Sequence, residues 1–190
     1  VWKQRGYRMP KKKVYILLSN TGTLLNKSIK KYTKAPYNHA SIAFDKELIE
    51  LYSFGRKNPR NPLFGGFVKE NIMDGTFARY PETTCLVYEM EISERELQKM
   101  IRILNVFKKN KNYLGFNVVG LVGVAINRPL FARRGAYFCS QFVAEVFVRA
   151  GLNLWGKVTS LVTPDDIKKT KEFILIYEGK LREYPGTTKQ

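Results

Sequence analysis

Residues 137–152 read Tyr-Phe-Cys-Ser-Gln-Phe-Val-Ala-Glu-Val-Phe-Val-Arg-Ala-Gly-Leu, and their apolar side chains recur at helical spacing. These apolar side chains follow the i, i+3, i+4, i+7, i+8, i+11 pattern of one buried helix face; they are Cys139, Phe142, Val143, Val146, Phe147 and Ala150. Gly151 follows at the position where a helix stop is expected. The stretch therefore predicts an amphipathic helix with Cys139 in its first turn.

Cys139 has two interpretations at this position. The free N–H groups and the positive dipole end of a helix N-terminus favour a thiolate, so the position suits a nucleophile. Cysteine is also one of the most frequently buried residues, and Cys139 belongs to the apolar stripe, which favours a structural role.

Composition predicts one globular domain. The chain has 190 residues, of which 44% are hydrophobic and 13% aromatic, enough for a sizeable core. The strand and helix patterns favour an α+β fold with an antiparallel sheet. We expect a basic N-terminal arm at residues 1–13 and a single domain at residues 14–190.

The net charge of +17, from 33 basic and 16 acidic residues, predicts attraction to polyanions. An anionic membrane surface or an acidic cell-wall polymer fits this charge. Nucleic acid is a minor alternative, because no nucleic-acid-binding motif is recognisable. We find no signal peptide and no apolar run long enough to cross a bilayer, so we expect a cytoplasmic protein, with membrane or envelope association as an alternative.

Histidine and cysteine counts limit the possible sites. His39 is the only histidine, which excludes sites built from several histidines, and we expect neither metal nor cofactor. Two cysteines are too few for a disulfide framework. Cys85 lies in a strand pattern and is expected in the core, although a Cys85–Cys139 disulfide stays open.

The segment around His39 predicts a β-hairpin. Residues 37–45 and 48–54 have strand patterns joined by a turn at residues 45–47, and residues 55–67 are expected to form a rim loop or lid. Upstream, Leu25, Ile29 and Tyr32 predict a short helix. Downstream, Ser93 with Glu96 and Thr163-Pro164 with two acids predict helix starts.

A cysteine nucleophile needs a neighbouring base, and that base needs a third group to orient its ring. His39 is the candidate base. The second hairpin strand offers two orienting groups, Glu50 and Ser53, which lie on opposite faces of the strand. A facing Glu50 would raise the pKa of His39, whereas Ser53 would only orient the ring.

Three stretches together resemble a known family: Tyr-Asn-His-Ala-Ser-Ile-Ala-Phe-Asp at 37–45, Leu-Tyr-Ser-Phe-Gly-Arg at 51–56 and Tyr-Phe-Cys-Ser-Gln-Phe-Val-Ala at 137–144. They are similar to the circularly permuted NlpC-type cysteine hydrolases, the YiiX-like and lecithin–retinol-acyltransferase-like branch of the papain-like superfamily. In that branch the histidine strand precedes the cysteine helix.

The resemblance implies a permuted papain-like fold, with an antiparallel sheet or small barrel packed against the cysteine-bearing helix. It also implies Cys139 as the nucleophile, His39 as the base and a third polar residue on the following strand. The implied activity is that of a thiol hydrolase or acyl transferase that forms a covalent acyl-enzyme, with cell-wall peptides or lipid-like acyl groups as substrates. The family pattern favours Ser53 as the third residue, whereas chemistry favours Glu50, the only carboxylate in the strand. The alternative function is a non-enzymatic basic adaptor that binds anionic membrane or polymer.

Overall fold

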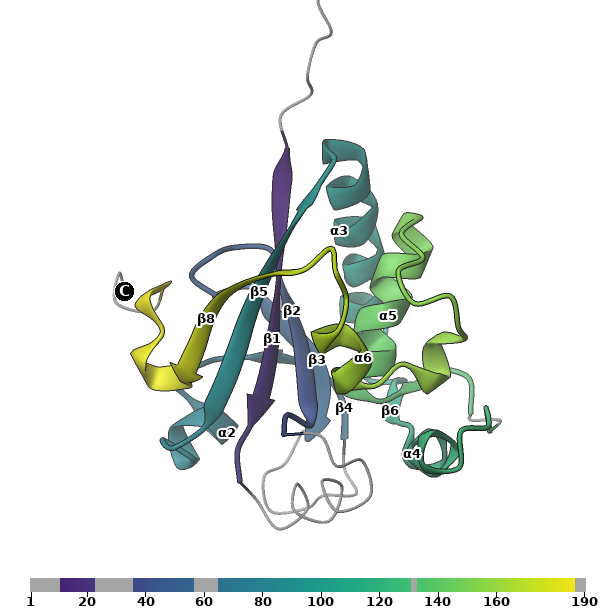
Figure 1. Ribbon diagram of the computed structural model, residues 1–190. Helices are drawn as coiled ribbons and strands as arrows, with labels where there is room; N and C mark the ends of the chain where they lie inside the picture. The colour runs from purple at the N-terminus through teal and green to yellow at the C-terminus, as the bar shows by residue number, and fades with distance from the viewer. Residues whose placement is uncertain (1–10, 23–35, 57–64, 131–132, 187–190) are drawn as a thin grey trace, which may run out of the picture.

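The computed structural model describes residues 11–22, 36–56, 65–130 and 133–186 (Figure 1). Their main feature is a six-stranded antiparallel sheet in the order β4-β3-β2-β1-β5-β8. The strands are β1 Lys12–Asn20, β2 His39–Ala43, β3 Leu51–Arg56, β4 Gly65–Glu70, β5 Thr84–Ile92 and β8 Ile174–Lys180. Among these described strands β4 and β8 are edges, so the sheet is open rather than a closed barrel. The predicted α+β class is confirmed.

Strand β1 lies in the middle of the sheet, paired with β2 on one side and β5 on the other. Its residues 14–18 are buried on both faces of the sheet, with Val14, Ile16 and Leu18 on one side and Tyr15 and Leu17 on the other. A strand covered on both faces needs an apolar run rather than alternation, which explains the sequence of β1.

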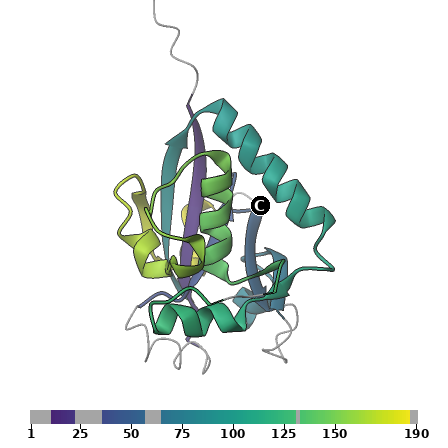
Figure 2. The same cartoon turned by 90° about the vertical axis from the view of Figure 1, so that its right-hand side faces the viewer.

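Three helices cover one face of the sheet: α3 Glu94–Lys109, α5 Cys139–Ala150 and α6 Pro164–Lys168 (Figures 1 and 2). The predicted helix at Cys139 is therefore confirmed as α5. Phe142 of α5 lies at the centre of an aromatic cluster, with ring centroids 5.3 Å from Phe54, 5.6 Å from Phe67 and 5.0 Å from Phe107. This cluster fixes α5 against β3, β4 and α3.

The other face carries a smaller core, covered by α2 Gly75–Arg79 and the 3-10 helix η2 Leu181–Glu183. The remaining elements are short: β6 Gly115–Phe116, α4 Val118–Ala125, β7 Ala136–Tyr137 and the 3-10 helix η1 Thr159–Leu161. Strands β6 and β7 pair in parallel and bracket α4 in the sequence. In the described ranges, no helix combines the length and apolarity that crossing a membrane requires.

The predicted helix boundaries are confirmed by their caps. Ser93 and Glu96 form a capping box at the start of α3, and Thr163 forms one with Asp166 at the start of α6. Gly151 ends α5 in the left-handed conformation, at φ 102°. Each cap satisfies backbone groups that the helix leaves without intrahelical partners.

The predicted basic arm ends earlier than expected. Lys12 and Lys13 belong to β1, because their backbone pairs with Ile92 and Glu91 of β5. Their side chains also meet acidic partners on neighbouring elements. Lys13 Nζ lies 2.6 Å from Glu89 and Lys12 Nζ lies 3.4 Å from Glu94. Residues 1–10 of the arm lie outside the described ranges, as does the predicted helix with Leu25, Ile29 and Tyr32.

The predicted rim loop at residues 55–67 is partly wrong. Gly55 and Arg56 extend β3, and Gly65 begins β4, with Arg56 paired to Gly65. Gly65 is needed for close packing, since a Cβ there would lie 2.8 Å from Phe116 Cβ. Residues 57–64 lie outside the described ranges.

The predicted hairpin forms with shorter strands. Strand β3 begins at Leu51 rather than residue 48, because both carboxylate oxygens of Asp45 accept backbone N–H bonds, from Ile49 and Glu50, at 2.7 Å each. Asp45 thus holds these residues in the turn. The β2–β3 ladder then covers only Ile42↔Tyr52 and Ala43↔Leu51.

Candidate active site

Cys139 is the first residue of α5, and its side chain is almost fully buried. Its Sγ lies 3.9 Å from the carbonyl oxygen of Asn38, just before β2. The backbone N–H groups of Ser140 and Ala40 donate to the sulfur and help to lower its pKa. The thiol is therefore held between the start of a helix and the start of a strand, among donors that favour its anionic form.

His39, the first residue of β2, is hydrogen-bonded to Cys139. Burial raises the pKa of the Cys139 thiol, but the bond to His39 and the charge of that ring outweigh this, and the pKa of Cys139 is lowered. Burial likewise disfavours the charged ring of His39, but the charge of Glu70 and the bond to Cys139 raise the pKa of His39 well above its ordinary value. Both shifts favour a thiolate–imidazolium pair.

Glu70, the last residue of β4, is the group that orients His39. Its Oε1 lies 2.7 Å from His39 Nε2, and its Oε2 accepts a hydrogen bond from Ser41 Oγ. With Nε2 held by Glu70, Nδ1 is the ring nitrogen left for Cys139. Burial raises the pKa of the Glu70 carboxyl, yet the charge and hydrogen bond of His39 outweigh it and lower that pKa.

Strand register brings these residues together. Glu70 is paired with Leu51, and Leu51 with Ala43, so the three side chains share one face of the sheet. Ser41 and His39 continue the same face of β2, because alternate residues point to the same side. The short ladder between β2 and β3 ends at Ile42, and α5 packs against both strands.

Glu50 does not reach His39 in the structure. Its carboxylate accepts hydrogen bonds from Lys69 Nζ, at 2.5 Å, and from the Tyr52 hydroxyl, and it lies 3.5 Å from Lys108 Nζ. The hydrogen bond from Lys69 is the main cause of the lowered pKa of Glu50. A carboxylate does orient His39, as expected from the sequence, but it is Glu70 on β4 and not Glu50, which precedes β3.

Ser53 shares the face of His39 but acts next to Glu70. Its hydroxyl is fully buried and helps to lower the pKa of Glu70. However, the Ser53 hydroxyl makes no hydrogen bond of regular geometry to any described residue. Ser53 therefore supports the orienting carboxylate and does not replace it.

Cys85 is a free thiol, as is Cys139, so the two do not form a disulfide in this structure. Cys85 is fully buried on β5, and burial raises its pKa to about 12. Its prediction as a core residue is confirmed. The surroundings of the two thiols therefore shift their pKa values in opposite directions: the pKa of Cys85 is raised and that of Cys139 is lowered.

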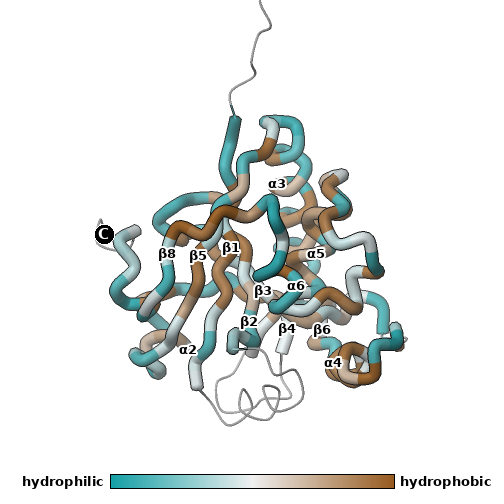
Figure 3. Tube along the Cα trace, viewed as in Figure 1, coloured by the Kyte–Doolittle hydropathy of each residue, from teal (hydrophilic) through white to brown (hydrophobic). Residues whose placement is uncertain are grey.

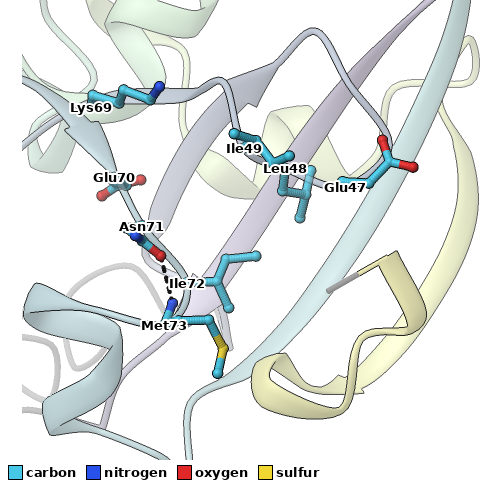
Figure 4. A pocket seen from close by; sticks show the side chains of 8 residues that line it. All are labelled: Glu47, Leu48, Ile49, Lys69, Glu70, Asn71, Ile72 and Met73. Atoms are coloured by element: carbon cyan, nitrogen blue, oxygen red, sulfur yellow. Dashed lines mark hydrogen bonds between the residues drawn. The ribbon is translucent and has the colours of Figure 1, made fainter. Parts of the chain in front are cut away.

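A cavity of about 290 Å³ lies beside Glu70, on the side of the turn before β3 (Figure 4). Figure 4 shows Leu48 and Ile49 on one side of it and Ile72 and Met73 below. Glu70 forms part of its wall, whereas Cys139 and His39 do not line it. In the described part of the chain, no group of three or more His, Cys, Asp or Glu side chains is placed to hold a metal ion.

Neither a scan against protein-family models nor a search of curated proteins finds a match for this chain.

Proposed function

We propose that the protein is a thiol hydrolase that cleaves an amide or ester through a covalent acyl-enzyme. The observation that carries this proposal is the hydrogen-bonded chain Cys139–His39–Glu70, in which a buried carboxylate and a histidine favour the thiolate. Nucleophile, base and orienting group each have the partner that nucleophilic catalysis requires.

In the proposed reaction, Cys139 Sγ attacks the acyl carbonyl carbon and forms a tetrahedral oxyanion. The backbone N–H groups of the first turn of α5 lie next to the sulfur and are the natural donors to that oxyanion. Collapse breaks the bond to the leaving group, which takes its proton from His39 Nδ1. Water, deprotonated by His39, then attacks the thioester and releases the acid, while Glu70 stabilises each imidazolium state.

The fold and substrate of this proposal come from the resemblance. The order of elements, with the histidine strand before the cysteine helix, agrees with a permuted papain-like arrangement. Cell-wall peptides and lipid-like acyl groups are the substrate classes that such hydrolases suggest, and both present a carbonyl that a thiolate can attack.

The proposal predicts that Cys139 is much more reactive than Cys85. We expect iodoacetamide at neutral pH to modify Cys139 at least about tenfold faster, because the pKa of Cys139 is lowered and that of Cys85 is raised to about 12. Mass spectrometry of the folded protein locates the label, and His39→Ala should slow labelling at Cys139 without unfolding the protein. Faster modification at Cys85 would contradict the proposal.

A non-enzymatic basic adaptor is the second candidate, favoured by the net charge of +17. It requires no reactive thiol. Failure of Cys139 to react with acyl-directed thiol probes, in protein that still binds acidic polymers, would favour the adaptor over the hydrolase.

A further inference from the structure

Helix α4 has the reverse of the usual arrangement for a surface helix. Val118, Val119, Val122 and Ile126 are each about half exposed, at 49%, 50%, 53% and 54%. At 100° per residue these positions fall within one face of the helix. The residues that α4 buries are instead glycines, Gly120 and Gly123.

The two glycines lie against the segments that flank α4. A Cβ on Gly120 would lie 2.2 Å from Asn117 Nδ2, in the N-cap, and one on Gly123 would lie 2.7 Å from the carbonyl oxygen of Arg128, just after the helix. Neither glycine leaves room for a side chain, so the buried side of α4 is backbone packed closely against its own flanking segments. The valines are left on the exposed side of the helix.

The stretch of chain that contains α4 carries charge of one sign only. Between Glu96 and Glu145 the chain carries eight Lys and Arg residues and no acidic residue. Three of these cations follow α4 directly, and all three are exposed; they are Arg128, Arg133 and Arg134. An apolar face beside arginines is the composition of helices that lie in the interface of an anionic bilayer.

Hydrogen bonds connect the start of α4 to α5 and to the residues just before it. Asn117, the N-cap of α4, donates from Nδ2 to Gln141 Oε1 at 3.0 Å and from its backbone N to the Tyr137 carbonyl oxygen at 3.0 Å. Figures 1 and 2 show α4 beneath the N-terminal end of α5, and Cys139 is the first residue of that helix. Figure 3 shows the hydrophobic colour of α4 at the molecular edge, with hydrophilic residues beside it.

We propose that the apolar face of α4, formed by Val118, Val119, Val122 and Ile126, docks together with Arg128, Arg133 and Arg134 onto an anionic lipid surface. An eight-residue helix is about 12 Å long and lies in the interface rather than crossing the bilayer. The arginines favour an anionic lipid surface over a second copy of this strongly basic chain, because two copies would bring like charges together.

Docking in this orientation brings the first turn of α5 toward the membrane surface. The docking itself does not depend on the proposed hydrolase chemistry. Cys139→Ser is therefore expected to bind vesicles as the wild type does, even if it has lost all reactivity. The two proposals can fail separately.

The test is co-sedimentation of the full chain with vesicles of phosphatidylcholine alone or with added phosphatidylglycerol. We expect binding to the anionic vesicles that weakens as salt rises. The double variant V119D/V122D should bind at least about tenfold more weakly, because two apolar contacts are lost and two like charges face the lipid. Val158→Asp is the matched control, since Val158 is equally exposed, at 54%, but lies outside α4.

A second pair of variants tests the contribution of the arginines to vesicle binding. Arg128→Glu should weaken binding to anionic vesicles, whereas Arg102→Glu, on the exposed side of α3, should change it less. The milder V119S/V122S pair checks that weaker binding does not come from unfolding, and all variants should melt near the wild-type temperature.

Three results would overturn the docking proposal. The first is equal binding to neutral and anionic vesicles. The second is V119D/V122D binding as tightly as Val158→Asp. The third is a wild-type dimer in solution that V119D/V122D converts to monomer, because the apolar face would then be the contact between two copies.

Discussion

At the scale of single residues, the site depends on where the Glu70 carboxylate lies. The side chains of His39 and Glu70 are 21% and 14% exposed, so both are largely removed from water. A buried charge is costly unless it is paired and hydrogen-bonded. The bonds of Glu70 to His39 and Ser41 meet this condition, and they also keep the His39 ring charged beside the thiol.

The pairing predicts a pH dependence of stability. The pKa of Glu70 is lowered on folding, so its contribution is complete above its ordinary value and is lost as pH falls through the folded-state pKa. The pKa of His39 is raised, so its contribution is complete below its ordinary value and is lost as pH rises through the folded-state pKa. Stability from this pair is therefore greatest between the ordinary pKa of a glutamate and the ordinary pKa of a histidine, and it declines on either side toward the folded-state values.

We expect Glu70→Gln to lower the free energy of unfolding near neutral pH by about 1–3 kcal/mol. The difference from wild type should shrink as the pH falls through the folded-state pKa of Glu70, because wild-type Glu70 then becomes protonated as well. Urea unfolding at a series of pH values measures this. A constant difference between wild type and Glu70→Gln across that range would mean that the carboxylate charge does not stabilise the fold.

Two of the three residues of this site, Cys139 and His39, could be predicted from the sequence. Cys139 was predicted from its place before an apolar helical stripe, and His39 from its place in a strand pattern. The need for a third group was also predicted, but Glu70 was not, because the candidates were restricted to the strand next to β2. The pairing of Leu51 with both Ala43 and Glu70 is a tertiary feature that no local pattern contains.

At the scale of elements, α5 is positioned by its aromatic side chains. Phe142 is fully buried and contacts rings from β3, β4 and α3. Replacement by a small residue leaves a cavity among rings that cannot all move inward.

We expect Phe142→Ala to lower the free energy of unfolding by about 3–5 kcal/mol. Val148→Ala, on the same helix but 37% exposed, is the control and should cost less than about 1 kcal/mol. Urea denaturation of both variants checks this. A similar loss for the two would show that the aromatic cluster does not anchor α5.

Helices with a regular repeat of apolar side chains were predictable from the sequence, whereas short elements and edge strands were not. Helices α3 and α5 each bury a regular stripe of apolar side chains. Their capping residues are recognisable in the sequence: Ser93 with Glu96 at the start of α3, and Gly151 at the end of α5. Strand β4 reads Gly-Gly-Phe-Val-Lys-Glu, an edge strand with two glycines and two charges, which has no clear alternation. Gly65 and Gly66 fell within the predicted loop at 55–67, although Gly65 serves close packing against Phe116. Glu70 lies just beyond that loop, where no strand was predicted.

At the scale of the whole molecule, the charge of +17 is unevenly distributed along the chain. The acid-free stretch from residue 97 to residue 144 ends at the first turns of α5 and contains α4. The net charge predicts attraction to anionic surfaces, with the basic arm at residues 1–13 and the apolar segment at residues 115–126 as possible contributors. In the structure this segment contains α4, whose exposed face could not be predicted, because an apolar run alone does not distinguish a buried helix from an outward-facing one.

The central claim is that Glu70, through His39, sets the reactivity of Cys139. The most direct measurement is the pH dependence of iodoacetamide modification at Cys139 in wild type, Glu70→Gln and Glu50→Gln. In wild type the rate should rise at a pH below the ordinary pKa of a thiol, because that pKa is lowered. Glu70→Gln should move the rise to higher pH and slow modification near neutrality by about tenfold. Glu50→Gln should follow the wild-type curve. Three superimposed curves, or a shift in Glu50→Gln alone, would contradict the account.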